Sequence, residues 1–277
     1  MPELPEVEVC RRGLEPELLG ALIEQVVIRS PKLRHVIPVE LRDLLPGCRI
    51  VGIRRRGKYL LIDCRSNTVQ GSLLVHLGMS GSLRFVAHGQ PVVKHDHFEL
   101  VLARHVLRFA DPRRFGLILW QPGPPEDSEQ HPLLAIQGIE PLSDDFTVDW
   151  LYQANLKRSG PIKPLLMDSH RVVGIGNIYA SESLFRAGIS PLRAANKISK
   201  ARYGLLVPAI RQTLSDAIAA GGSTIRNYMH SDGSSGWFQI QVGVYDRAGE
   251  PCLRCGGMVK QVRQAGRSTF YCPGCQH

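Results

Sequence analysis

The chain contains no apolar run long enough to cross a membrane. Its longest runs, such as residues 73–75 and 117–120, fall far below the roughly 18 residues that span a bilayer. The first residues, MPELPEVEV, contain three glutamates but neither the basic start nor the hydrophobic stretch of a secretory signal. We therefore expect a cytoplasmic protein.

Cysteine is scarce outside the C-terminal tail. Three of the seven cysteines, Cys10, Cys48 and Cys64, lie in the first quarter of the chain, and we expect reduced thiols there because cytosolic disulfides are rare. The other four form two CxxC pairs separated by sixteen residues, at Cys252, Cys255, Cys272 and Cys275. This doubled spacing is typical of a structural zinc site closed by four thiolates, and it fits unrelated cysteines or a redox pair less well. We predict one structural Zn²⁺ ion without a catalytic role.

Acidic residues are outnumbered by basic ones. The chain has 34 Lys and Arg against 25 Asp and Glu, which gives a net charge of +9 and a pI near 9.4. This balance favours a polyanionic partner, because phosphate neutralisation releases condensed counterions. Charge alone does not separate nucleic-acid binding from an unrelated basic surface, so the motifs must decide.

Short β-rich runs separated by turn residues dominate the chain from Leu22 to Trp120. They cover residues 26–29, 49–54, 59–63, 72–77, 98–102, 106–109 and 117–120. The pattern predicts an antiparallel β-sandwich or barrel, of which we favour the sandwich. Residues 3–19, with glutamates in the first turn, helical apolar spacing and Gly20 as a stop, predict one preceding helix.

The second half of the chain has helical periodicity. Residues 121–132, rich in Pro, Gly and acidic residues, predict a solvated linker and a domain boundary. The helices expected beyond it cover residues 150–156, 162–167, 178–187 and 199–220. A stretch rich in glycine and serine then leads to the cysteine-bearing tail. We predict three domains, at residues 1–131, 132–240 and 241–277.

The segment between the two cysteine pairs is typical of a β-hairpin with a turn at residues 264–266. It carries Lys260, Arg263 and Arg267, and a rigid basic hairpin suits phosphate contact. A solvated charged face explains the hairpin alone equally well. Arg267 is therefore a candidate that needs support from elsewhere in the chain.

The residue after Met1 is a proline, and a small second residue lets the initiator methionine be removed. Removal would expose the secondary amine of Pro2 beside Glu3 and Glu6. The ordinary pKa of an α-amino group is near 8, against about 10.4 for lysine, so more of it is unprotonated at neutral pH. Its attack on a sugar anomeric carbon would form an iminium. Proline and glutamate are also common at helix starts, so the segment alone leaves a capping role open.

Seven motifs, taken together and in this order, resemble those of bacterial formamidopyrimidine-DNA glycosylases. They are MPELPEVE at the N-terminus, RGKYLL at 56–61, HLGMSG at 76–81, KHDH at 94–97, DPRRFG at 111–116, GIGNIYASE at 174–182 and the two CxxC pairs. The resemblance runs from end to end. It implies an α+β fold with an N-terminal helix, an antiparallel β-sandwich catalytic domain, a helical DNA-binding domain with a helix-two-turns-helix motif, and a β-hairpin zinc finger.

The resemblance also implies four catalytic residues. Pro2 matches the nucleophile that forms the Schiff base, and Glu3 matches the acid that protonates the opening sugar, with Glu6 as a supporting carboxylate. Lys58 matches the proton donor in β-elimination, although it is also explained as a surface charge at a strand end. Arg267 matches the hairpin arginine of δ-elimination, where an always-charged guanidinium is better suited to clamp a phosphate.

Further residues match DNA-contacting positions. Met79, Arg113 and Phe115 match the side chains that fill the space left by an everted nucleotide, which we call the wedge. Without the motifs, core packing and a surface charge would explain them. The backbone-binding positions are His76, His95, Arg158 and Asn177. Lys163 and the loop at 224–228 match the region that closes over the everted base, and Asn227 stands where we expect threonine in many relatives.

These features predict a bifunctional DNA glycosylase and abasic-site lyase of base excision repair, associated with the bacterial nucleoid while it acts. We expect it to excise 8-oxoguanine and formamidopyrimidines from duplex DNA and to cleave the strand by β,δ-elimination. The alternative is a catalytically inactive damaged-DNA-binding protein on the same scaffold, which would have no need of Pro2, Glu3 and Lys58. The sister glycosylase for oxidised pyrimidines begins PEGPE, so Leu4 argues against it. A zinc-ribbon protein of transcription or translation leaves the N-terminus unexplained.

Overall fold

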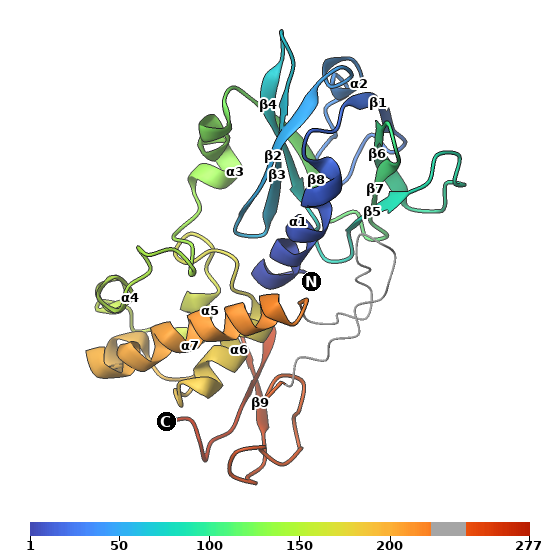
Figure 1. The fold of residues 1–277 in the computed structure, drawn as a ribbon. Coiled ribbons are helices and arrows are strands. Elements are labelled where there is room, and N and C mark those ends of the chain that lie inside the picture. Colours follow the sequence, from blue (N-terminus) through green and yellow to red (C-terminus); the bar gives the residue numbers. More distant parts are fainter. Residues whose placement is uncertain (223–241) are drawn as a thin grey trace. The chain divides into compact units, whose positions relative to one another are not determined.

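The computed structural model describes residues 1–222 and 242–277 (Figure 1). The chain forms two compact units. The first contains Met1–Ile136, and the second contains Gln137–Ala220 together with the described residues of the C-terminal tail. Within the described ranges, every helix is too short or too polar to cross a membrane.

The first unit is a sandwich of two four-stranded antiparallel sheets, ordered β1-β6-β7-β5 and β2-β3-β4-β8. Its strands are β1 (Ile23–Ile28), β2 (Arg49–Arg56), β3 (Tyr59–Arg65), β4 (Gln70–His76), β5 (Ser82–Val86), β6 (Asp96–Leu102), β7 (Val106–Ala110) and β8 (Leu117–Pro122). Apolar residues of both sheets share one core, which also takes in Val7, Cys10 and Leu14 of helix α1 (Leu4–Leu18). The sequence-based prediction of a helix followed by a β-sandwich is confirmed.

The two central strands of the second sheet, β3 and β4, are buried on both faces. Leu60 and Ile62 of β3 face the shared core, whereas the intervening Leu61 belongs to a separate cluster with Leu74 and Leu134. Leu134 lies on the short helix α3 (Pro132–Ala135). Because both faces of β3 and β4 are covered, these strands are apolar at successive positions instead of alternating with polar residues.

The sequence analysis missed β5 and the regular structure within residues 121–132. Strand β8 extends to Pro122, and the following residues form the 3₁₀ helix η1 (Pro125–Gln130), in which Ser128 is the buried residue and most others face solvent as expected. Arg54 makes a two-pronged ion pair with Asp63 at 2.7 and 2.8 Å and also donates to the carbonyl of Pro125 at 2.9 Å and to Ser128 Oγ at 3.0 Å. These polar contacts hold the segment in place, and they cannot be predicted from the periodicity of apolar residues.

The second unit contains the expected helices, within two residues at each end. They are α4 (Val148–Asn155), α5 (Ile162–Leu166), α6 (Asn177–Arg186) and α7 (Lys200–Ala219). The predicted tail hairpin is also present, as strands β9 (Lys260–Gln264) and β10 (Arg267–Tyr271). Its small core joins Val244, Val259 and Phe270 to Phe185 of α6, so the tail packs on the helical part of its own unit.

Candidate active site and DNA-binding elements

The N-terminus lies at the start of α1, beside two buried carboxyl groups. Glu3 caps the helix and Glu6 reaches back to it, accepting a hydrogen bond from the Glu3 N–H at 2.8 Å. The two residues are 2% and 0% exposed. The sequence around Pro2 therefore serves as a helix start and also brings the chain terminus next to acidic groups, so the capping and catalytic interpretations are compatible.

The terminal amine lies in a strongly charged environment. Burial lowers the pKa of the Met1 ammonium below its ordinary value of 8.0, the charges of Glu3 and Glu6 oppose this, and those of Lys58 and Arg113 reinforce it. Lys58 is presented by the two-residue turn between β2 and β3, where Gly57 has φ +56°. A turn of the second sheet and the loop between β7 and β8 thus each supply a cation close to the amine.

His76 ends β4 as a neutral imidazole. Its Nδ1 accepts a hydrogen bond from the Gly78 N–H at 2.9 Å, which leaves the proton on Nε2. Burial lowers the pKa of His76 to about 4, assisted by the charges of Lys58 and Arg34. His76 can therefore offer a DNA phosphate an N–H hydrogen bond rather than an ion pair.

The wedge side chains are exposed, unlike core residues. Met79 is 39% and Phe115 is 45% exposed, and the Arg113 guanidinium lies 4.8 Å from the centre of the Phe115 ring. His95, in the loop before β6, has φ +78°, a conformation that a residue other than glycine seldom adopts. The exposure of Met79 and Phe115 suits contact with a partner better than internal packing.

In the second unit, Lys163 and Asn177 bind each other and the tail hairpin. The Lys163 ammonium donates to Asn177 Oδ1 at 2.6 Å, to Thr269 Oγ1 at 2.8 Å and to the Ser268 carbonyl at 3.2 Å. Asn177 Nδ2 donates to the same carbonyl at 2.9 Å. Lys163 is only 1% exposed, so the structure shows it as an internal link, and its expected contact with DNA stays a prediction.

Two predicted phosphate ligands of this unit are open to solvent. Arg158 follows α4, and Arg267 begins β10 opposite Gln264 in the hairpin. Arg267, Lys163 and Thr269 line a cavity of about 200 Å³. The predicted base-capping loop at 224–228, with Asn227, lies outside the described residues.

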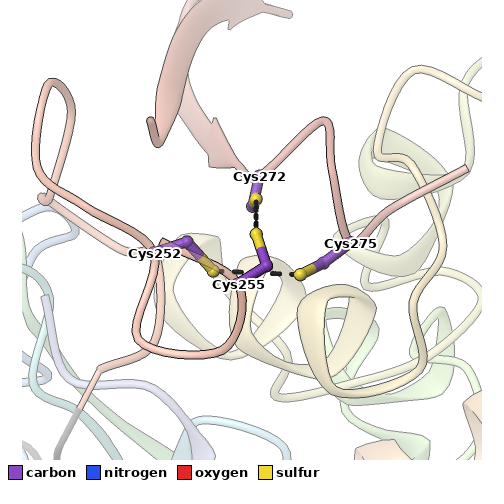
Figure 2. Close-up of side chains that lie close together, drawn as sticks. All are labelled: Cys252, Cys255, Cys272 and Cys275. Carbon is purple, nitrogen blue, oxygen red and sulfur yellow. Dashed lines mark hydrogen bonds between the residues drawn. The ribbon is translucent and has the colours of Figure 1, made fainter. Parts of the chain in front are cut away.

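The four tail cysteines converge on one point (Figure 2). The Sγ atoms of Cys252 and Cys275 are 3.9 Å apart, those of Cys255 and Cys272 are 3.5 Å apart, and all four lie within 4.8 Å of one another. Four sulfurs at about 2.3 Å from a tetrahedral zinc are separated by about 3.8 Å, so the cluster fits that ion. Burial opposes ionisation of Cys252, yet the N–H groups of Arg254 and Cys255 lower its pKa to about 7.

Glu182 is a structural residue that the sequence analysis quoted without giving it a role. Its carboxylate accepts hydrogen bonds from three successive N–H groups, those of Gly243, Val244 and Tyr245, at 2.7 to 3.0 Å. It thereby fixes the start of the cysteine-bearing tail to α6. An acidic residue among the apolar positions of a helix was the signal that could have identified it.

Comparison with known proteins agrees with this arrangement. Three family models match in succession: the formamidopyrimidine-DNA glycosylase N-terminal domain at residues 1–118, the H2TH domain of that glycosylase at 137–229, and a zinc finger found in FPG and IleRS at 249–277. The formamidopyrimidine-DNA glycosylase of Dechloromonas aromatica (strain RCB) is 75% identical over 277 residues, and that of Marinobacter nauticus is 48% identical over 277 residues. Both matches cover 100% of each chain.

Solved structures give the same result. Lactococcus lactis Fpg in complex with DNA containing an abasic site has a TM-score of 0.90 and 35% identity, with 99% of each chain covered. The MutM (Fpg) protein of Thermus thermophilus has a TM-score of 0.86 and 39% identity, covering 99% of this chain and 98% of that one. Fold, cysteine cluster and matches together define a DNA-repair glycosylase with a zinc finger. The chain belongs to the formamidopyrimidine-DNA glycosylase family.

We predict that Cys252→Ser loses both its metal and its DNA binding, because metal binding to four thiolates contributes on the order of 10 kcal/mol to folding of such a site. Metal content by atomic absorption and duplex binding by fluorescence anisotropy measure the two effects. Cys10→Ala, at a cysteine outside the cluster, should keep both. Normal DNA binding by a metal-free Cys252→Ser protein would contradict the expectation.

We predict that His76 makes the protein less stable in acid. Because its pKa is lower in the folded protein than in the unfolded chain, the unfolded chain takes up the proton first, and stability falls as the pH drops from about 6.5 towards 4. Between pH 7 and pH 5 this amounts to about 1 to 2 kcal/mol. Urea unfolding at both pH values should show a smaller loss in His76→Gln, whose amide can still accept the Gly78 N–H. Equal losses in the two proteins would refute the assignment.

Proposed function

We propose that this chain excises oxidised purines, both 8-oxoguanine and formamidopyrimidines, from duplex DNA and then cleaves the strand at the resulting abasic site. The observation that carries the proposal is the position of the chain's start beside the buried carboxyl groups of Glu3 and Glu6, where the charges of Lys58 and Arg113 also act on the terminal amine. A binding protein would have no use for a terminal amine beside two buried carboxyl groups. Solved relatives support the substrate class, since a mutant of Lactococcus lactis Fpg has been crystallised with DNA containing Fapy-dG.

In the proposed chemistry, removal of Met1 exposes the Pro2 nitrogen, which attacks the sugar C1′ and forms a C–N bond as the bond to the base breaks. Glu3 protonates the ring oxygen, so the sugar opens to an iminium. Loss of a C2′ proton then expels the 3′ phosphate by β-elimination, and a second elimination expels the 5′ phosphate. Lys58 moves protons in the first elimination, and Arg267 binds the departing phosphate.

We propose a division of labour among the predicted domains. Residues 1–131 carry the chemistry and the wedge, residues 132–240 bind the DNA backbone through Arg158 and Asn177, and residues 241–277 bind it through Arg267. One Zn²⁺ ion held by the four tail cysteines keeps the hairpin folded and takes no part in the reaction. His76 and His95 supply further phosphate contacts from the first domain.

The nucleophile is tested by blocking the amine. An uncleavable extension before Pro2 should leave folding and DNA binding intact but abolish both borohydride-trapped adduct and strand cleavage, measured on a duplex with one 8-oxoguanine opposite cytosine. Pro2→Gly should retain partial activity, because it keeps an amine and loses only the ring that directs it. If the extended protein traps and cuts DNA as fast as the processed one, Pro2 is not the nucleophile and the inactive-binder alternative is excluded as well.

The wedge is tested by comparing two substrates. Met79→Ala and Phe115→Ala should slow base excision from the duplex by about tenfold or more, since the wedge offsets an unstacking cost of a few kcal/mol. Cleavage at a preformed abasic site should change much less, because that site has no base to unstack. Equal losses on both substrates would show that these side chains serve packing instead.

A further inference from the structure

The wedge residues stand on two loops whose backbones touch. Gly78, next to Met79, has φ +65°, and a Cβ atom there would lie 2.4 Å from the Gly116 nitrogen and 2.5 Å from the Phe115 carbonyl carbon. A Cβ at Gly116 would lie 2.8 Å from the His76 carbonyl oxygen. Only glycine permits so close an approach. The loops at residues 77–81 and 111–116 therefore pack as one body.

A single buried carboxylate joins these loops. Asp111 is 0% exposed, and its Oδ1 accepts hydrogen bonds from Ser80 Oγ at 2.6 Å and from the Arg113 N–H at 3.2 Å. Its Oδ2 accepts one from the Gly116 N–H at 2.7 Å. Ser80 Oγ in turn accepts from the Arg113 N–H at 3.2 Å. Asp111 thus holds Met79 through its neighbour Ser80, Phe115 through its neighbour Gly116, and Arg113 through its own backbone.

The backbone of Asp111 is fixed as well. Its N–H donates to the His95 carbonyl at 3.0 Å, and its own carbonyl lies 2.9 Å from Nε2 of the buried His97. The same carbonyl accepts from the N–H of Arg114, which has φ +55°. The carboxylate is therefore held against the first sheet, and the conformation of the wedge loop depends on it.

We propose that Asp111 is a positioning residue for base eversion, with Ser80 as its bridge to the second loop, and that together they set the wedge before DNA arrives. The inference rests on the proposed role of Met79, Arg113 and Phe115. Exposed side chains on a loose loop would lose conformational entropy on entering the base stack, and a preformed geometry avoids that loss. Charge-assisted bonds to backbone N–H groups are strong enough to hold such a geometry.

The test uses Asp111→Asn, Ser80→Ala and Ser80→Thr. In Asp111→Asn, one carboxylate oxygen is replaced by an NH₂ group, which cannot accept a hydrogen bond. In one orientation of the amide this NH₂ group faces the Arg113 N–H, and in the other it faces the Gly116 N–H, so one bond is lost in either case. Asp111→Asn and Ser80→Ala should excise 8-oxoguanine about tenfold more slowly than the wild type. Both should cleave a preformed abasic site at a rate within about twofold of the wild type. The fluorescence of a 2-aminopurine placed next to the lesion, which reports unstacking, should rise more slowly in both variants. Ser80→Thr keeps the hydroxyl and should restore most of the rate. Ser66→Ala, at a serine that makes similar turn bonds at the far end of β3, serves as the control.

The outcomes separate the inference from the function on which it rests. Normal excision by Asp111→Asn, or equal slowing on both substrates with a lower melting temperature, would overturn the positioning role. If Met79→Ala and Phe115→Ala show the selective loss and Asp111→Asn does not, the wedge stands and the positioning role fails. If neither Met79→Ala nor Phe115→Ala shows the selective loss of excision, the wedge role and the positioning role both fail. The inference is supported if the two wedge variants and Asp111→Asn all lose excision activity but keep abasic-site cleavage, and if Ser80→Thr excises at nearly the wild-type rate.

Discussion

Hydrogen bonds from backbone N–H groups to buried carboxylates hold the functional parts of this protein in place. Glu6 fixes the N-terminus by accepting the Glu3 N–H, Asp111 fixes the two wedge loops, and Glu182 fixes the beginning of the tail. In each case the carboxylate accepts hydrogen bonds from N–H groups of a segment that lies outside the helices and strands. The segments that carry the proposed reactive and DNA-contacting side chains gain a defined geometry in this way.

The same interactions shape the electrostatics of an otherwise basic chain. The net charge is +9, and some of the acidic groups are buried, at the terminus and in the first sheet, where Asp96 and Glu99 pair with Arg84 and Arg108. Internal acids are thus matched by internal donors, while cations such as Arg113, Arg158 and Arg267 stay exposed. These exposed arginines add to the positive charge that a polyanion would meet.

Local pattern was enough to predict much of the fold. The cysteine spacing identified the metal site, and periodicity located the first helix, seven of the strands, the four longer helices of the second unit and the tail hairpin. Strand β5 escaped because Arg84 interrupts its short apolar run, and the 3₁₀ helix η1 escaped because Arg54, about seventy residues earlier, provides its contacts. The roles of Asp111, Lys163 and Glu182 likewise depend on partners distant in sequence. Motif resemblance marked the residues of the candidate site, but it could not show that Lys163 is enclosed or that Asp111 joins two loops.

The pairing of β1 with β6 has a consequence for synthesis. Strand β1 (Ile23–Ile28) lies at the edge of its sheet and has β6 (Asp96–Leu102) as its neighbour, so the sandwich cannot close until about the hundredth residue has been made. At about 5–20 residues per second, translation of that length takes roughly 5–20 s. During this interval the N-terminus, partly buried in the finished protein, has not yet packed against the closed sandwich. The proposed removal of Met1 therefore has a period in which an aminopeptidase can reach the first residue before the new end is buried.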